Sequence, residues 1–142
     1  GRVRYRPIIE KFAPKLQCLG EMVNGFAARA APAHRLVMVG DLNVAPLETD
    51  VWSHKALLKV VSHTPVEVEL LDALAASHGW IDTARVFTPP EERLYSWWSY
   101  RARDWDSADR GRRLDHAWVT PALEGALRSV ETLRPARGWD RP

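Results

Sequence analysis

Segments with helical periodicity alternate along this chain with short apolar runs, and this alternation limits the fold to layered α/β classes. The apolar residues from Phe12 to Phe26 recur at spacings of four and three, which predicts a helix over residues 13–29. Residues 36–39 are continuously apolar, as in a buried strand. We therefore expect helices packed on a sheet.

Two later segments continue the alternation. Thr64 and Glu67 have the spacing of a capping box, which predicts the start of a helix that Gly79 ends. Residues 114–120 alternate like a strand, and residues 127–134 are a further candidate strand.

The composition indicates a globular protein, and we predict that residues 1–142 form a single domain. A chain of 142 residues, 46% of them hydrophobic, with a formal net charge of +2, is too apolar to be disordered. Its one cysteine, Cys18, excludes an internal disulfide and a cysteine-built metal site. No apolar run approaches the ~18 residues of a membrane span, and no signal peptide is visible. We expect a protein of the reducing cytoplasm with no membrane partner.

An acid and an amide follow the first candidate strand. Asp41 and Asn43 lie two residues apart at the carboxyl end of that strand, where layered α/β folds build their sites. A carboxylate suits Mg²⁺ or acts as a base beside a phosphate, and an amide both donates and accepts. The alternative is that the two residues only form an Asx turn.

Aromatic and arginine side chains are concentrated in residues 93–113, which hold five aromatics and six arginines. Arginine can neutralise phosphates while rings stack on bases, so Trp97, Tyr100 and Arg101 are candidate nucleic-acid contacts. The alternative is a core strand whose alternate rings are buried beside solvated arginines.

A third candidate is Asp115, early on the strand predicted over 114–120. A carboxylate there can orient a catalytic histidine and stabilise its charge. His116 points to the opposite face of such a strand, so we interpret it as a packing residue and not as the partner of Asp115.

Four stretches together resemble exonuclease III, the bacterial apurinic/apyrimidinic endonuclease branch of the endonuclease/exonuclease/phosphatase superfamily. They are GDLNVAP (40–46), HTPVEVELLDALAASHGWIDTAR (63–85), LYSWWSYR (94–101) and DRGRRLDHAWVTPAL (109–123). The resemblance implies a four-layer α/β/β/α sandwich, like deoxyribonuclease I. It also implies hydrolysis of DNA phosphodiesters with Mg²⁺ or Mn²⁺, 5′ of abasic sites and from 3′ ends of duplex DNA, by an enzyme that is a monomer.

The resemblance also implies roles for single residues. Asp41 would be the general acid/base at the scissile phosphate, and Asn43 would hold that phosphate and the attacking water. Both would be metal-site residues. Asp115 would pair with the catalytic histidine. Trp97 would line the pocket or wedge against the DNA, with Tyr100 beside it, and Arg101 would contact the backbone.

Some parts of the family pattern are absent from the sequence. The family's Ser-Asp-His segment and its early metal-binding Glu, Asn and Tyr have no match. We therefore expect a domain truncated at both ends, inactive alone, and poorly soluble or molten because one sheet face is uncovered.

Two other functions remain open. One is a phosphatase of the same superfamily, which would have no use for the extended aromatic and arginine surface of 95–113. The other is a module that only binds nucleic acid, which would gain nothing from carboxylates near phosphate. A cation requirement for DNA binding would favour the nuclease.

Overall fold

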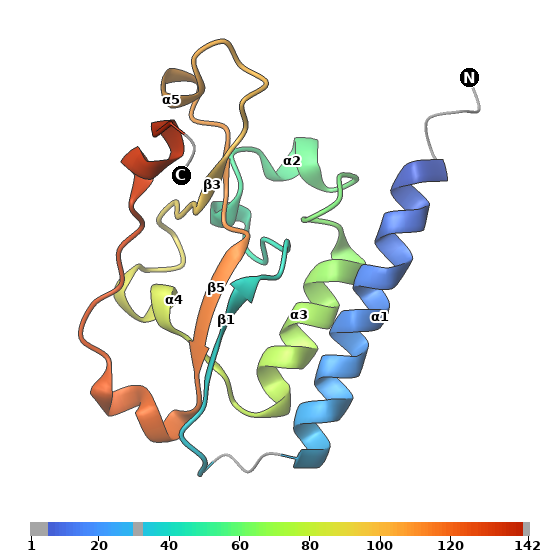
Figure 1. The fold of residues 1–142 in the computed structure, drawn as a ribbon, viewed down its shortest axis with the longest axis vertical. Helices are drawn as coiled ribbons and strands as arrows, with labels where there is room; N and C mark the ends of the chain where they lie inside the picture. The colour runs from blue at the N-terminus through green and yellow to red at the C-terminus, as the bar shows by residue number, and fades with distance from the viewer. Residues whose placement is uncertain (1–5, 30–32, 141–142) are drawn as a thin grey trace.

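A three-stranded antiparallel sheet lies at the centre of the protein (Figure 1). The computed structural model describes residues 6–29 and 33–140. In the sheet, β5 (Asp115–Val119) is the middle strand and pairs with β1 (Val37–Asp41) and β2 (Ile81–Asp82). The two long helices are α1 (Arg6–Arg29) and α3 (Pro65–Ser77).

The other elements are short. They are η1 (Glu48–Asp50), α2 (His54–Leu57), α4 (Thr83–Phe87), β3 (Trp97–Trp98), α5 (Trp105–Ala108), β4 (Gly111–Arg112), η2 (Pro121–Ala126) and η3 (Arg134–Gly138). Strands β3 and β4 form a separate two-stranded sheet. No helix in the described ranges is long and apolar enough to cross a membrane.

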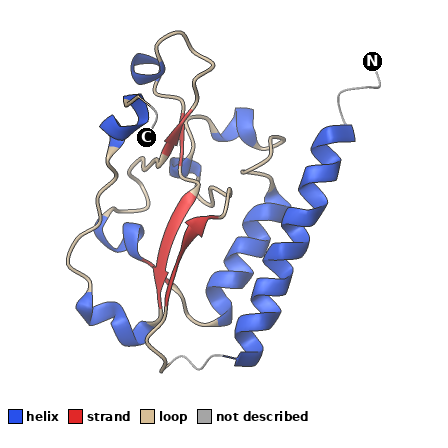
Figure 2. Cartoon of the chain, in the orientation of Figure 1, coloured by secondary structure: helices blue, strands red, loops and turns tan. Residues whose placement is uncertain are grey.

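Helices α1 and α3 cover one face of the three-stranded sheet (Figure 2). Leu19 of α1, Leu71 and Leu74 of α3, and Trp118 of β5 form the main core. On the opposite face of β1, Val37 is 64% exposed and Val39 is 71% exposed. The expectation of a buried strand over residues 36–39 is therefore wrong, because α1 and α3 lie on a single face and strand side chains alternate between faces.

Helix α1 begins earlier than its apolar spacing predicts. It starts at Arg6, so Pro14 lies inside the helix and removes one backbone hydrogen bond there. Packing against α3 offsets that loss, because Leu19 is buried and Lys15 Nζ lies 2.5 Å from Glu67 Oε1 on α3. Tertiary contacts, and not propensity, supply most helix stability.

The predicted start of α3 is confirmed. The carboxylate of Glu67 accepts hydrogen bonds from the Thr64 amide at 3.1 Å and its hydroxyl at 2.7 Å, and from the Ser62 amide at 2.9 Å. This carboxylate is fully buried, and Lys15 balances its charge. Gly79 follows the helix with φ +59°, a conformation that favours glycine.

The strand predicted over 114–120 is confirmed as β5, whereas the strand predicted over 127–134 is wrong. Residues 127–133 carry no regular structure, and the chain then turns into η3. A strand needs a neighbour to satisfy its backbone groups, and no described strand pairs with this segment.

Candidate active site

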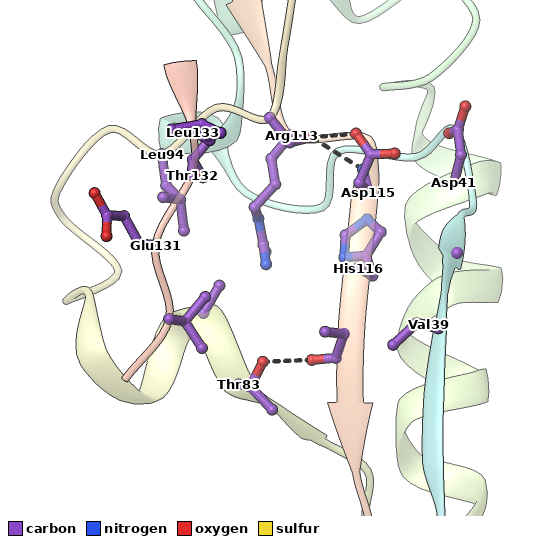
Figure 3. A pocket seen from close by; sticks show the side chains of 15 residues that line it. Val39, Asp41, Thr83, Leu94, Arg113, Asp115, His116, Glu131, Thr132 and Leu133 are labelled. Atoms are coloured by element: carbon purple, nitrogen blue, oxygen red, sulfur yellow. Dashed lines mark hydrogen bonds between the residues drawn. The ribbon is translucent and has the colours of Figure 1, made fainter. Parts of the chain in front are cut away.

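A hollow of about 460 Å³ opens on the uncovered face of the sheet, beside the end of β1 and the start of β5 (Figure 3). Asp41 and Asp115 both line it. They are register partners across the two strands, which puts both side chains on one face with their Cβ atoms about 5 Å apart. The other polar lining residues include Ser96, Arg113, His116 and Glu131. The structure therefore brings Asp41 and Asp115 into one crevice.

Asn43 lies next to this hollow, in the turn that leaves β1, but it does not line the hollow. Its amide donates to Asp41 Oδ1 at 2.8 Å and to the Leu114 carbonyl at 3.2 Å, and its φ is +52°. Lys15 of α1 donates to the Asn43 carbonyl at 2.5 Å. The Asx turn is thus present, and it fixes the Asp41 carboxylate while leaving the residue exposed.

Ser96 holds Asp115 in place. Its hydroxyl accepts from the amides of Leu114 and Asp115, both at 3.0 Å, and donates to Asp115 Oδ2 at 2.7 Å. A carboxylate fastened in this way needs little reorganisation to orient a partner. The sequence did not indicate Ser96 as a site residue. Its hydroxyl reaches Asp115 only because the fold brings the residue before β3 next to the start of β5.

His116 borders the hollow, but its ring points to the other face of β5 from the Asp115 side chain, as strand alternation predicts. It is 5% exposed and its Nε2 donates to the Val44 carbonyl at 2.7 Å. Burial lowers its pKa, and the positive charge of Arg113 lowers it further. His116 is therefore a buried packing residue whose surroundings favour the neutral imidazole.

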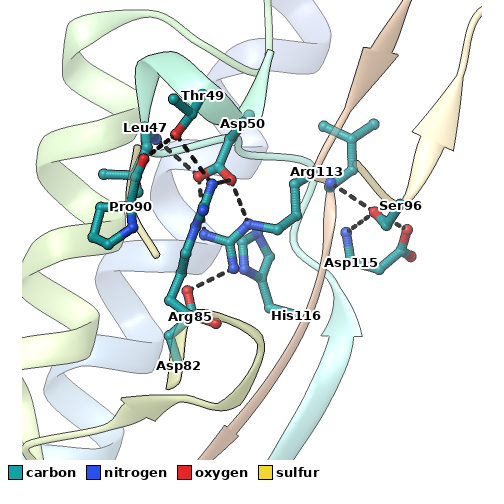
Figure 4. A network of polar contacts seen from close by, with 12 residues as sticks. Leu47, Thr49, Asp50, Asp82, Arg85, Pro90, Ser96, Arg113, Asp115 and His116 are labelled. Carbon is teal, nitrogen blue, oxygen red and sulfur yellow. Dashed lines mark hydrogen bonds and ion pairs between the residues drawn. The ribbon is translucent and has the colours of Figure 1, made fainter. Parts of the chain in front are cut away.

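A buried ion-pair network lies beside the hollow (Figure 4). Asp50 is fully buried and accepts hydrogen bonds from Nε of Arg113 at 2.7 Å, Nη2 of Arg113 at 2.9 Å and Nη2 of Arg85 at 2.7 Å. Arg113 also contacts Asp82 at 2.6 Å. Burial by itself would lower the pKa of Arg113, but its hydrogen bonds and charge interactions with Asp50 and Asp82 raise it overall. Sequence analysis missed this network, because its members are distant in the chain.

The carboxylate pair fits a hard divalent cation. Two acids on one face repel each other, and a cation between them removes that cost. Mg²⁺ is commonly held by one or two carboxylates and completes its shell with water and substrate oxygens. Among the side chains that the structure describes, those of residues 12–26 and 33–140, no three His, Cys, Asp or Glu gather closely enough to hold a metal. Asp41 and Asp115 would therefore provide part of a coordination shell.

The candidate nucleic-acid contacts lie outside the carboxylate hollow. Trp97 and Arg101 line a second hollow, while Tyr100 is 58% exposed. Arg137 from η3 stacks on Tyr100 with its guanidinium carbon 3.6 Å from the ring centroid, and also lies 5.2 Å from the Trp97 ring. Part of the aromatic surface is thus covered by the chain's own arginines, a contact that local sequence could not indicate.

Two known proteins that are similar to this chain are both nucleases. The chain is 32% identical to the exodeoxyribonuclease of Bacillus subtilis over 74% of its length, covering 41% of that protein. It is 35% identical to the DNA repair nuclease APEX1 of Danio rerio, again over 74% of its length and covering 33% of that protein. The chain thus spans less than half the length of these relatives.

A solved structure of an AP endonuclease from Archaeoglobus fulgidus matches with a TM-score of 0.76 and 29% identity, over 86% of this chain and 46% of that one. The expected fold class, an α/β fold of the deoxyribonuclease I type, is confirmed by this likeness. The model of the Endonuclease/Exonuclease/phosphatase family matches residues 4–137. Since this match takes in most of the sequence, the chain belongs to the Endonuclease/Exonuclease/phosphatase family.

Proposed function

We propose that this chain is part of a Mg²⁺- or Mn²⁺-dependent DNA phosphodiester hydrolase of the exodeoxyribonuclease III type. Its substrates would be double-stranded DNA with abasic sites or 3′ ends. The observation that carries this proposal is the register-paired, exposed carboxylates of Asp41 and Asp115 at one hollow. The similarity to an exodeoxyribonuclease and to a DNA repair nuclease supports the substrate class.

In this proposal, each site residue acts through a contact that its position allows. Asp41 moves a proton as general acid/base at the phosphate, and Asn43 holds the phosphate and the attacking water. Asp115, fastened by Ser96, orients a histidine, a role that His116 does not take because it lies on the opposite face.

A cation fits the same positions. Asp41, with the amide oxygen of Asn43 or the carboxylate of Asp115, would hold it. A bound Mg²⁺ would polarise the phosphate and stabilise the leaving oxygen. The exposed state of both carboxylates leaves their oxygens accessible to such an ion.

The aromatic segment supplies the DNA contacts in this proposal. Trp97 and Tyr100 offer flat rings, and Arg101 is exposed beside them. Phosphoryl transfer depends mainly on positioning and charge neutralisation, so a surface that holds the backbone contributes directly to rate.

We expect the 142-residue chain by itself to bind DNA without cutting it. The hollow is lined by the carboxylates of Asp41, Asp115 and Glu131, but the described side chains include no group of three that could hold a metal ion. Incubation of the purified chain with an abasic-site duplex and Mg²⁺ tests this expectation. Clear cleavage would refute it, and hydrolysis of a small phosphomonoester instead of DNA would favour the phosphatase alternative.

The metal role is tested by DNA binding with and without Mg²⁺. We expect Mg²⁺ to tighten binding of the abasic-site duplex to the wild-type chain. Asp41→Asn and Asp115→Asn should each remove most of that gain, while Asp140→Asn, an exposed acid outside the hollow, should leave it unchanged. Binding that ignores both the cation and the two site variants would indicate a nucleic-acid module without catalysis.

A further inference from the structure

A hollow of about 190 Å³ lies between α3 and the helix-covered face of the sheet. Leu71 of α3, Asp82 of β2 and Trp118 of β5 are among the residues that line it. We call it the indole hollow, because Trp80 and Trp118 form part of its wall. Arg113 is the lining residue that it shares with the carboxylate hollow. None of its lining residues is one to which we assign a metal or DNA contact.

The fold brings three of the lining residues together. Asp82 and Trp118 are register partners across β2 and β5, which puts both side chains on one face of the sheet. Trp80 precedes Asp82 by two positions, and residues two apart in an extended chain point to the same side. Trp80 is 7% exposed and Trp118 is 2% exposed, and both belong to the main core. The three side chains therefore lie close together at the wall of the indole hollow.

Three buried polar atoms of these residues have no hydrogen-bond partner among the residues that the structure describes. They are the indole Nε1 atoms of Trp80 and Trp118 and the Oδ1 atom of Asp82. The other carboxylate oxygen of Asp82 accepts from Arg113 at 2.6 Å. A buried polar atom without a partner is costly, and native proteins contain few of them. Since two of these atoms donate and one accepts, a single ligand satisfies them only if it both accepts and donates.

The charge of the lining favours a neutral ligand. Asp72 and Asp82 line the indole hollow together with the cation Arg113. Arg113 already pairs with Asp50 and Asp82, so little of its positive charge is left to attract an anion. A simple cation would be attracted to the acids but offers no acceptor to the two indole N–H groups. The remaining lining residues are apolar or aromatic, which suits a compact ring.

We propose that the indole hollow binds a small neutral amide. The carbonyl oxygen of such a ligand has two lone pairs and accepts from the indole N–H groups of Trp80 and Trp118, while the amide N–H donates to Asp82 Oδ1. The volume of about 190 Å³ is several times the roughly 30 Å³ that one water molecule occupies in the liquid, so a ring of about five or six atoms fits. This inference goes beyond the proposed function and does not rest on it.

Titration of the 142-residue chain with γ-butyrolactam, a five-membered cyclic amide, tests the proposal. Heteronuclear NMR reports on the indole N–H signal of each tryptophan. We expect saturable shifts of the Trp80 and Trp118 signals, because both N–H groups gain an acceptor. We expect no shift of the Trp105 and Trp139 signals, because neither residue lines the indole hollow.

Two matched ligands separate the amide from its parts. The N-methylated lactam keeps the carbonyl but cannot donate to Asp82. Pyrrolidine has a ring of the same size, is a cation at neutral pH and lacks the carbonyl. We expect each to bind more weakly than the lactam by at least about tenfold, the scale of one lost hydrogen bond to a charged group.

A variant pair separates this hollow from the rest of the protein. Trp80→Phe keeps an aromatic ring but removes the N–H group, so it should weaken lactam binding by about fivefold or more. The matched control is Trp105→Phe, which changes a half-buried tryptophan of α5 outside the indole hollow and should leave the affinity unchanged. If Trp80→Phe does not fold, the three ligands on the wild-type chain still decide.

The proposal is overturned if the lactam shifts neither indole signal, or if its N-methylated form or pyrrolidine binds as tightly. It is also overturned if Trp80→Phe and Trp105→Phe weaken binding equally. Asp41→Asn should leave lactam binding unchanged while it removes the Mg²⁺-dependent gain in DNA binding. Failure of this site and failure of the proposed function therefore give different results.

Discussion

Arg112 and Arg113 are neighbours in the chain and lie in opposite electrostatic environments. Arg113 is buried between Asp50 and Asp82, and those carboxylates raise its pKa. Arg112 faces the second hollow with no carboxylate beside it, and its pKa is lowered. Successive side chains of an extended segment point to opposite sides, so Arg113 enters the interior and Arg112, half-buried, lines the second hollow. The comparison separates an arginine whose charge is balanced by buried carboxylates from one whose charge has no carboxylate beside it.

The Arg113 network also supports the carboxylate hollow. Asp50 belongs to η1 and Arg85 to α4, while Arg113 directly precedes the segment that carries Asp115. The ion pairs therefore tie three separate segments together next to the proposed catalytic residues. Arg112 makes no ion pair with a described residue, and its side-chain partners are the Ser62 hydroxyl, the Val61 carbonyl and the Trp97 ring.

The largest expected effect comes from removing the acid that Arg113 needs. Asp50→Ala would leave Arg113 and Arg85 buried without their shared partner, and we expect a loss of about 3–5 kcal/mol in the free energy of unfolding. Urea unfolding measures it. The control Asp106→Ala breaks an exposed pair with Arg134 and should cost less than about 1 kcal/mol. Equal losses of stability in the two variants would contradict the conclusion that the buried network stabilises the protein more than the exposed pair does.

A smaller loss of stability is expected at Gly111, which directly precedes Arg112 and Arg113. A Cβ on Gly111 would lie 2.0 Å from Cδ2 of the Tyr95 ring, so Gly111→Ala should destabilise the protein by about 1–3 kcal/mol through overpacking. Gly125→Ala is the matched control, because nothing lies within 4 Å of its added Cβ. Thermal unfolding of both variants measures the difference, and a stable Gly111→Ala protein would show that the ring moves away readily.

The charge of Arg113 also predicts that the stability of the protein depends on pH, because Arg113 affects the pKa of His116. The folded pKa of His116 is lowered, first by burial and then by Arg113, while Asp82 and Asp50 oppose that shift. The unfolded chain therefore takes up a proton first, near pH 6.5. The stability that His116 contributes is complete above about pH 6.5 and falls as the pH decreases toward the folded pKa, with a slope of at most about 1.4 kcal/mol per pH unit.

Urea midpoints between pH 8 and pH 5 measure this dependence. His116→Gln should flatten the profile relative to the wild-type chain. Parallel profiles for the wild-type chain and His116→Gln would show that burial and Arg113 do not control this imidazole.

The smallest effect is expected at Arg112 itself. Arg112→Gln loses hydrogen bonds but also removes an unbalanced, half-buried charge, so stability should change by less than about 1 kcal/mol. Arg113→Gln, the same change one residue later, should cost about 3 kcal/mol or more because it strands Asp50. Similar values for the two variants in urea unfolding would contradict the comparison.

Much of the local structure could be predicted from the sequence. The capping box of α3, the strand β5 and the turn at Asn43 each depend on residues within a few positions of one another. The shared hollow of Asp41 and Asp115 was expected only through the family resemblance, because their pairing depends on the register of β1 and β5. The missing strand at 127–134 and the early start of α1 show the limit of periodicity, since both were decided by whether a neighbour was present.

The sequence by itself therefore determined the helix cap, the alternation of β5 and the chemical types of the candidate site residues. The tertiary structure alone decided which face of β1 is exposed, and which of two adjacent arginines receives a carboxylate. The physical reason is distance along the chain. A cap joins atoms three residues apart, whereas Asp50 and Arg113 are separated by 63 positions and meet only after the sheet has formed.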